Sequence, residues 1–237
     1  MKRSWWIACV AGMVSACGGA ASSDPEVASE RGGTSGDEAR RERHDGVQIT
    51  GLMGTISREE VEDALNPRMP RFTRCFAQRL GDVEFLAGDI RMAFRIATDG
   101  AVLWVYPASS SIGDRQTEQC VLGVARETRF PRPHGGEAEF AWGFGFDAPE
   151  DVRPPLSWEP DALGRRLGDV AGLASACSAR GHEVTVYIEP GGRVLSAGGS
   201  APSAEAEPGL DCILERVRGW AMPDPGSYAA KVTFPVH

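Results

Sequence analysis

The chain has 237 residues and a formal net charge of −8 at pH 7, with 42% hydrophobic and 24% charged residues. This composition is that of an ordinary globular protein, which argues against a disordered or membrane-spanning body. Because the charge is acidic, we expect no binding to nucleic acid or to anionic lipid by electrostatic attraction.

Residues 1–16 are predicted to be an export signal rather than part of the fold. Lys2 and Arg3 precede an apolar run that is too short to cross a membrane as a mature helix. The small residues Val14–Ala16 stand before Cys17, and this pattern resembles the lipobox of bacterial lipoprotein signal peptides. The resemblance implies cleavage before Cys17, diacylglycerol on its sulfur and a membrane anchor. An ordinary signal peptide with a chance cysteine is the alternative.

Residues 17–46 are predicted to form a lipidated, disordered tether. They contain many Gly, Ser and charged residues and almost no large apolar one, so they cannot bury enough surface to fold. As a flexible coil they would reach roughly 30 Å from the membrane. Gly18 lacks the carboxylate that retains enterobacterial lipoproteins at the inner membrane, so we expect a cell-envelope protein, with the outer membrane preferred.

The rest of the chain contains an internal repeat. When Gly192 is aligned on Gly100, an offset of 92 residues, a cysteine, two prolines and the apolar alternation of a strand stay in register without a gap. A chance match rarely keeps all of these together, so the repeat indicates a duplication. The aligned pairs include Met92 and Val184, Phe94 and Val186, Ile96 and Ile188, Cys120 and Cys212, Leu122 and Leu214, Pro131 and Pro223, and Pro133 and Pro225. We therefore expect two tandem small domains, 47–147 and 161–237, joined by a Pro-rich linker at 148–160.

The first copy is predicted to run helix, strand, strand, helix, strand. Ser57 and Glu60 have the spacing of a capping box, at the start of a helical segment that ends near Leu80 and that prolines break in two. Asp99-Gly100 supplies the turn of a hairpin. Asp114 is a suitable N-cap for the next helix, and alternating aromatic residues then predict a strand. The segments are 57–80, 90–96, 102–106, 114–128 and 140–146.

The second copy repeats this order with a shorter connection between its first helix and its first strand. Its segments are 167–178, 183–189, 193–197, 210–218 and 228–236. In each copy the helices would cover one face of a three-stranded antiparallel sheet, which places the chain in the α+β class.

Four cysteines remain in the two copies: Cys75, Cys120, Cys177 and Cys212. Four cysteines allow three pairings, and the repeat favours one bond inside each copy, Cys75–Cys120 and Cys177–Cys212. Each bond would connect the first helix of a copy to its second helix. The sequence has no Cys-x-x-Cys and no short Cys/His cluster, so we predict neither a metal site nor thiol redox chemistry.

No catalytic motif is evident, so we predict a protein that is not an enzyme and has no cofactor. The four histidines, His44, His134, His182 and His237, do not fall into a frame with a nucleophile and an acid. Ser110 lies in a run of three serines without the glycines of a nucleophile elbow.

Large aromatic residues are the candidates for binding another protein. Val102, Trp104 and Tyr106 are expected to share one face of a strand, and Trp142 lies on the last strand of the first copy. Packing in the core is the simpler role for these side chains, and a binding groove is the alternative. The candidate interaction residues are Trp104, Tyr106, Phe130, Pro131 and Trp142.

A longer motif runs through the first copy, "RCF…LAGDIRMAFRIATDGAV…SSSIGDRQTEQCV…FPRPHGG…FGF". Its characteristic residues are Cys75-Phe76, Gly88, Phe94, Ile96, Asp99-Gly100, Ser110-Ser111, Cys120-Val121, Phe130-Pro131, Pro133, Gly135-Gly136 and Phe146. This motif resembles the AgmX/PglI C-terminal domain family of cell-envelope proteins, which belongs with the TonB C-terminal-like domains. Phe76 stands where that family usually has Tyr, and the resemblance covers residues 46–147.

The resemblance implies a non-catalytic role in protein–protein contact, in which an extended segment of a partner pairs with a free sheet edge. We therefore predict an interaction module on a lipid-anchored envelope protein, with unknown envelope proteins as partners, in a TonB-like or gliding-motility-related complex. The first copy, which keeps the motif, is expected to carry the binding function. The alternative is a periplasmic ligand-binding or carrier lipoprotein that uses the cleft between the copies.

Overall fold

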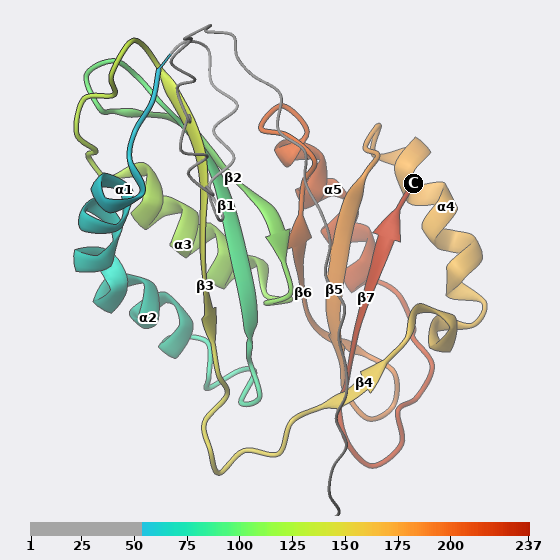
Figure 1. The fold of residues 1–237 in the computed structure, drawn as a ribbon. Helices are drawn as coiled ribbons and strands as arrows, with labels where there is room; N and C mark the ends of the chain where they lie inside the picture. Colours follow the sequence, from blue (N-terminus) through green and yellow to red (C-terminus); the bar gives the residue numbers. More distant parts are fainter. Residues whose placement is uncertain (1–53) are drawn as a thin grey trace, which may run out of the picture. The chain divides into compact units, whose positions relative to one another are not determined.

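The structure is a computed structural model that describes residues 54–237, which belong to a single compact unit of the chain. The predicted signal peptide, Cys17 and the tether lie outside the described residues. Within 54–237 no helix is long and apolar enough to cross a membrane. Helices and sheets combine in an α+β arrangement, as predicted (Figure 1).

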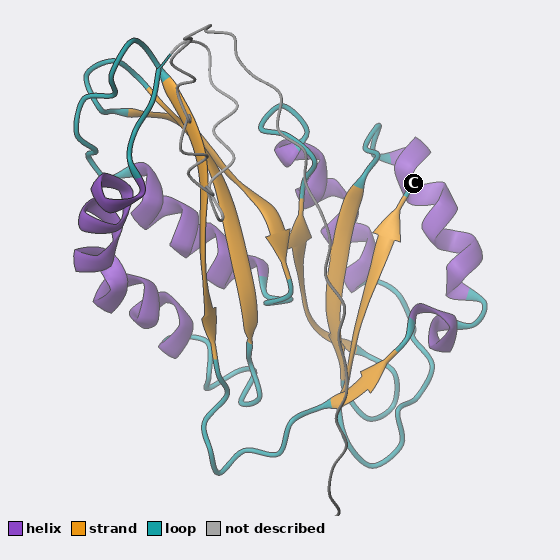
Figure 2. Ribbon diagram, in the orientation of Figure 1, coloured by secondary structure: helices purple, strands orange, loops and turns teal. Residues whose placement is uncertain are grey.

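The first copy forms a three-stranded antiparallel sheet with the strand order β2-β1-β3. Its helices lie on one face of that sheet (Figure 2). The elements are α1 (Arg58–Leu65), the 3-10 turn η1 (Asn66–Arg68), α2 (Met69–Ala77), β1 (Gly88–Ile96), β2 (Val102–Ser110), α3 (Arg115–Arg126) and β3 (Ala138–Phe146). The predicted order of elements in this copy is therefore confirmed.

The second copy has the same order but one strand more than predicted. Its elements are β4 (Leu156–Trp158), the 3-10 turn η2 (Pro160–Leu163), α4 (Arg166–Ala176), β5 (His182–Ile188), β6 (Val194–Ser200), α5 (Glu207–Arg218) and β7 (Ala230–Val236). The sheet has the order β4-β7-β5-β6, with β4 parallel to β7. The prediction of a three-stranded sheet is wrong here, because the chain after Pro154-Pro155 stays extended and Leu156 donates its N–H to the Ala229 carbonyl at 2.9 Å.

Local sequence signals set the helix boundaries as expected. The capping box forms: the Glu60 N–H donates to Ser57 Oγ at 3.2 Å, and Glu60 Oε2 accepts from the Ser57 N–H at 2.8 Å. Asp114 caps α3 by accepting a hydrogen bond from the Thr117 N–H at 2.8 Å. Pro67 stands in η1, where the chain passes from α1 to α2.

Aromatic residues of β3 face the helices, as their alternation predicts. Phe72 of α2 lies 4.9 Å from Phe144 and 5.8 Å from Trp142 between ring centroids. Phe76 stacks on Phe146 at 4.4 Å. This row of rings joins α2 to β3 and forms one side of the first core.

The second strand of the first hairpin does not follow the predicted alternation. The register of β1 and β2 shifts between Arg95 and Ile96, which adds one residue to β2. Val105, only 4% exposed, therefore lies opposite Phe94 on the core face. Trp104 and Tyr106 lie on the other face of the sheet, so the expectation that they share a face with Val102, and the core role for them, are wrong.

The repeat is visible at the turn of each hairpin. In the first copy the Phe130 N–H donates to the Gly100 carbonyl at 3.0 Å, and in the second the Met222 N–H donates to the Gly192 carbonyl at 2.8 Å. The φ angles of the two glycines are +84° and +80°. Phe130 and Met222 are 4% and 6% exposed, so the large residue before each Pro-x-Pro fills the core beneath the turn.

Substitutions at the second turn test this packing. Gly191 and Gly192 both have positive φ, but a Cβ on Gly192 would overlap the Met222 carbonyl, whereas a Cβ on Gly191 would meet open space. We expect Gly191→Ala to lower the free energy of unfolding by about 1 kcal/mol through backbone strain alone, and Gly192→Ala to lower it by about 3 kcal/mol. Urea unfolding of the two variants checks this difference, and equal losses would contradict it.

Candidate functional site

One disulfide in each copy joins two of its helices. Cys75 of α2 is bonded to Cys120 of α3, with 5.6 Å between the Cα atoms, and Cys177 at the end of α4 is bonded to Cys212 of α5, with 5.7 Å. The predicted pairing is thereby confirmed. The bonds close loops of 45 and 35 residues, which restricts the unfolded chain by about 4 kcal/mol each in the loop-entropy model.

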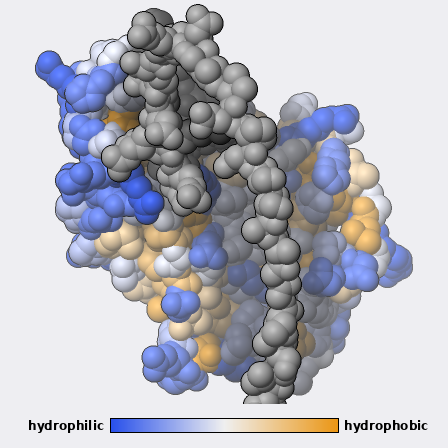
Figure 3. Space-filling view, viewed as in Figure 1, coloured by the Kyte–Doolittle hydropathy of each residue, from blue (hydrophilic) through white to orange (hydrophobic). Residues whose placement is uncertain are grey.

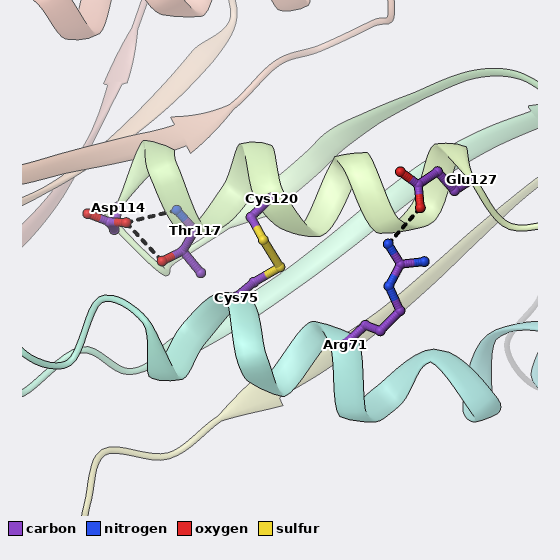
Figure 4. The surroundings of a disulfide bond; sticks show 6 residues. All are labelled: Arg71, Cys75, Asp114, Thr117, Cys120 and Glu127. Carbon is purple, nitrogen blue, oxygen red and sulfur yellow. Dashed lines mark hydrogen bonds and ion pairs between the residues drawn. A yellow bond between two sulfur atoms is a disulfide. The ribbon is translucent and has the colours of Figure 1, made fainter.

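Ion pairs flank the first disulfide on both sides. Arg71 of α2 pairs with Glu127 after α3 at 2.6 Å (Figure 4). At the other end Arg79 pairs with Asp114, the N-cap of α3, at 3.1 Å. The order of these contacts shows that α2 and α3 run antiparallel, so the disulfide fixes the middle of a helix pair whose ends are held by charge.

The two copies meet along β2 and β6, which are equivalent strands of the repeat. Figure 1 shows them side by side, each at the edge of its own sheet, and the Ala201 N–H after β6 donates to the Pro107 carbonyl of β2 at 2.9 Å. The equivalent helices α3 and α5 meet beside them. Arg115 forms ion pairs with Glu207, its own counterpart in the repeat, and with Asp211 at 2.7 Å. We call this contact region the junction.

A buried carboxyl group lies at the centre of the junction. Glu118 of α3 is fully buried and accepts hydrogen bonds from the Gly199 N–H of β6 at 2.9 Å and from Ser110 Oγ at 2.7 Å. Gly198 lies so close to Glu118 that a Cβ on it would overlap the Glu118 carboxyl group. Burial raises the pKa of Glu118 to about 7, although its hydrogen bonds and the nearby Arg115 act in the opposite direction.

Asp114 is a second carboxyl group at the junction, and its pKa is shifted in the opposite direction to that of Glu118. Burial by itself would raise its pKa, but hydrogen bonds from Arg79, Ser196 and Thr117 hold the pKa below the usual value. Ser196 Oγ of β6 lies 2.7 Å from the Asp114 carboxylate and also donates to the Gly113 carbonyl at 2.9 Å. The N-cap of α3 in the first copy is therefore fixed by a side chain from the second copy.

An aromatic contact closes the other side of the junction. Tyr187 of β5 is buried in the core of the first copy, 5.4 Å from the Phe85 ring, and its hydroxyl donates to the Ala87 carbonyl at 3.0 Å. Lys231 of β7 donates to the same carbonyl at 2.7 Å. Burial lowers the pKa of Lys231 to about 8.

A hollow lined by both copies opens beside the junction. It has a volume of about 460 Å³ and is polar. Its charged groups are largely bonded to one another, Arg79 to Asp114 and Arg115 to Asp211. Within residues 54–237 no group of three or more His, Cys, Asp or Glu is placed to hold a metal ion.

A groove follows β3 on the far side of the first copy. It lies between α1 and β3 and has a volume of about 220 Å³. We call it the β3 groove; it is lined by Ile56, Ser57, Arg58, Val61, Glu62, Arg91, Phe140, Ala141, Trp142 and Gly143. Ile56, Val61 and Phe140 lie beneath the groove and are at most 6% exposed. The exposed lining is therefore mostly polar, and it includes the Arg58–Glu62 ion pair of 2.7 Å. Apolar surface also gathers where α2 meets the end of β3 (Figure 3).

The sheet edge beside this groove carries no strand among the described residues. β3 has nine residues and pairs with β1 on one side. Its counterpart β7 in the second copy is paired on both sides, with β5 and with β4. The two copies therefore differ at this outer edge of the sheet.

The structure separates the predicted interaction residues into three places. Trp142 is half-buried at the β3 groove. Trp104 and Tyr106 form a pair on the opposite face of the sheet, with 5.6 Å between their ring centroids. Phe130 is in the core, and Pro131 next to it is exposed.

Sequence reasoning missed Glu118, although a signal for it exists. Residues Val121, Leu122 and Ala125 follow it at the spacing of one helix face, and all three are buried. A carboxyl group on such an apolar stripe requires a buried hydrogen-bond donor. The donor is Gly199 of the other copy, which the local pattern of α3 does not contain.

Comparison of the chain with models of known protein families, with curated proteins and with solved structures finds no match. The resemblance to the AgmX/PglI C-terminal domain family therefore stays a prediction.

The ionisation of Glu118 predicts how stability depends on pH. In the unfolded chain this carboxyl has the ordinary pKa of 4.5, and in the fold about 7. The contribution of Glu118 to the free energy of unfolding is therefore fully present below pH 4.5. It is lost as the pH rises through 7, and the free energy of unfolding falls by about 3 kcal/mol in total. We expect Glu118→Gln to flatten this part of the profile in urea unfolding between pH 5 and pH 8. The control is Glu215→Gln on the exposed side of α5, and an unchanged profile in Glu118→Gln would contradict the assignment.

Proposed function

We propose that this chain is a non-enzymatic lipoprotein of the cell envelope that binds another protein through the outer edge of β3. The observation that carries the proposal is the nine-residue outer edge of β3, which carries no strand among residues 54–237 and lies beside the β3 groove. A strand edge offers backbone donors and acceptors to an extended segment, and an adjacent groove selects its side chains. A TonB-like or gliding-motility-related envelope complex is the setting that the sequence motif suggests.

The asymmetry between the copies supports this choice of site. The edge of β7 is covered by β4, so the second copy offers no equivalent place. The edge of β3 and the β3 groove belong to the copy that keeps the Gly135-Gly136 pair of the motif. The first copy thus combines the sequence motif with an edge that carries no strand among residues 54–237.

The alternative, a carrier that holds a small ligand between the copies, has less support. Ligand pockets are mostly apolar with a few polar groups that fix orientation. The hollow at the junction has the opposite character, because its lining is charged apart from Leu195 and a few neutral polar residues. The hydrogen bonds of Glu118 and Ser196 also join the copies directly.

The predicted lipid anchor is tested at Cys17. We expect the native chain to take up a palmitate label and to sediment with membranes, and Cys17→Ala to lose the label and to appear in the soluble periplasmic fraction. A single acyl chain binds membranes only weakly, whereas the several chains of a lipoprotein hold it firmly. The control is Cys9→Ala, which changes a cysteine within the predicted signal peptide. Membrane attachment of Cys17→Ala without label would contradict the anchor.

Binding at β3 is tested by site-specific photo-crosslinking in the native envelope. A photoreactive residue at Ala141 of β3 should capture a partner, and the same residue at the exposed Glu215 of α5 should not. Trp142→Ala should weaken capture at Ala141 by tenfold or more, since a tryptophan at the centre of an interface often contributes about 2 kcal/mol.

The matched control for Trp142→Ala is Trp104→Ala, which removes the same side chain from the opposite face of the sheet. Thermal unfolding of both variants shows whether the fold is retained. Capture that is lost in Trp104→Ala and kept in Trp142→Ala would contradict the proposed site.

A further inference from the structure

In the second copy, the face of the sheet that points away from the helices is covered by the first copy. Thr185 and Tyr187 of β5 point to this face, because the residues that alternate with them lie in the second core, and both are fully buried. The cover is the connection between α2 and β1. The Tyr187 hydroxyl donates to the Ala87 carbonyl at 3.0 Å, and the Phe85 ring lies 5.4 Å from the Tyr187 ring.

The second copy has no equivalent connection with which to cover the first sheet. Residues 78–87 connect α2 to β1, but only residues 177–181 connect α4 to β5. The junction pairs β2 with its counterpart β6, and Arg115 with its counterpart Glu207, which is the pattern of an approximate two-fold relation between the copies. Under that relation, a cover for the first sheet requires a long connection in the second copy.

The corresponding face of the first sheet is accordingly exposed, and we call it the open face. Ala93 and Arg95 of β1 are the counterparts of Thr185 and Tyr187 at the offset of 92 residues, yet both are only half-buried. Arg91, on the same face, is exposed. Within residues 54–237, the difference in one connection thus leaves one sheet face covered and the other without a cover.

The centre of the open face carries only small side chains. Ala93 lies opposite Tyr106 of β2 and opposite Ala141 of β3. In the next row Arg91 lies opposite Gly143, where a hollow of about 300 Å³ opens. A flat ligand can therefore approach the backbone of the sheet here, next to the side chains of Tyr106 and Arg91.

Two aromatic rings stand beside this floor of small residues. Trp104 and Tyr106 are half-buried, and their ring centroids lie 5.6 Å apart. Burial raises the pKa of the Tyr106 hydroxyl, and the negative charges of Glu139 and Glu205 act in the same direction. The hydroxyl therefore stays protonated and can donate a hydrogen bond, while the rings offer a surface on which a cyclic ligand can stack.

Polar groups surround the floor with balanced charge. Arg95 pairs with Glu137 at 2.7 Å at one end of the face. Asp89, Arg91 and Ser109 line the hollow at the other end. These five side chains include both hydrogen-bond donors and acceptors, and their formal charges cancel.

We propose that the open face binds an oligosaccharide chain. Sugar hydroxyls both donate and accept hydrogen bonds, so they need polar partners of both kinds and no net charge, and the apolar face of a sugar ring can stack on Trp104 or Tyr106. A sheet face with these properties binds either oligonucleotides or oligosaccharides in other folds. A nucleic acid requires positive charge, which neither this face nor the chain, with its net charge of −8, supplies. This site goes beyond the proposed function, which concerns the outer edge of β3.

Titration of the purified mature chain with two neutral linear hexasaccharides, chitohexaose and cellohexaose, tests the inference by calorimetry. We expect binding of at least one of them, and Trp104→Ala should weaken it by roughly tenfold or more, as loss of a stacking ring does. Trp104→Phe keeps a ring and should lose less affinity. The control is Trp158→Ala, which removes a tryptophan of β4 in the second copy and should leave the affinity unchanged.

Amide signals of the unaltered chain locate the site without any substitution. Those of Ala93 and Gly143 should shift when the bound hexasaccharide is added, and that of Glu215 on α5 should not. Absence of binding for both hexasaccharides, shifts confined to other elements, or an equal loss of affinity in Trp104→Ala and Trp158→Ala would overturn the inference. Tighter binding of a thymidine hexanucleotide than of either saccharide would also overturn it.

The two proposals fail separately. If Trp104→Ala loses the saccharide and Ala141 still captures a protein in that variant, both proposals stand. If no saccharide binds while capture at Ala141 depends on Trp142, the open face is not a saccharide site and the proposed function stands. If a saccharide binds at Trp104 while Ala141 captures nothing, the inference stands and the proposed binding edge fails.

Discussion

The packing of the described chain depends on satisfying the backbone groups of two strand edges at the junction. A buried N–H without an acceptor costs about 1–3 kcal/mol, and β2 and β6 bring their edges together inside the molecule. Glu118 accepts from Gly199, and Pro107 accepts from Ala201. Pro107 also has no N–H of its own on that side, because the N–H and C=O of a strand residue point in the same direction. This arrangement buries the Glu118 carboxyl group, and the burial raises its pKa.

Each copy has its own internal restraints, and the junction joins the two copies. A disulfide joins the two helices, and a buried residue before the Pro-x-Pro hydrogen-bonds to the glycine of the hairpin. These contacts are equivalent in the two copies. The outer edges are not equivalent, because β4 covers β7. The two copies therefore share the features that stabilise each copy and differ at the outer edge, where we propose that binding occurs.

Local and periodic signals in the sequence were sufficient for most of the fold. Capping residues, the glycine turns, the apolar alternation and the repeat predicted the helices, most strands and both disulfides. The face of Trp104 was not predictable, since a single added residue in β2 reverses the alternation and leaves no local signal. The short strand β4 depends on the hydrogen bond of Leu156 to the distant Ala229, and the β3 groove is lined by residues far apart in the sequence, such as Val61 and Phe140.

The contact between Arg115 and Glu207 depends on a difference between the two copies. The two residues occupy the same position in their copies, at the first residue of α3 and of α5. In a symmetric homodimer of one ancestral copy, this position would face itself across the two-fold axis, and two identical side chains would carry the same charge. Opposite charges at this position require two copies of different sequence. A symmetric pair of either copy alone would instead place two like charges opposite each other at this position.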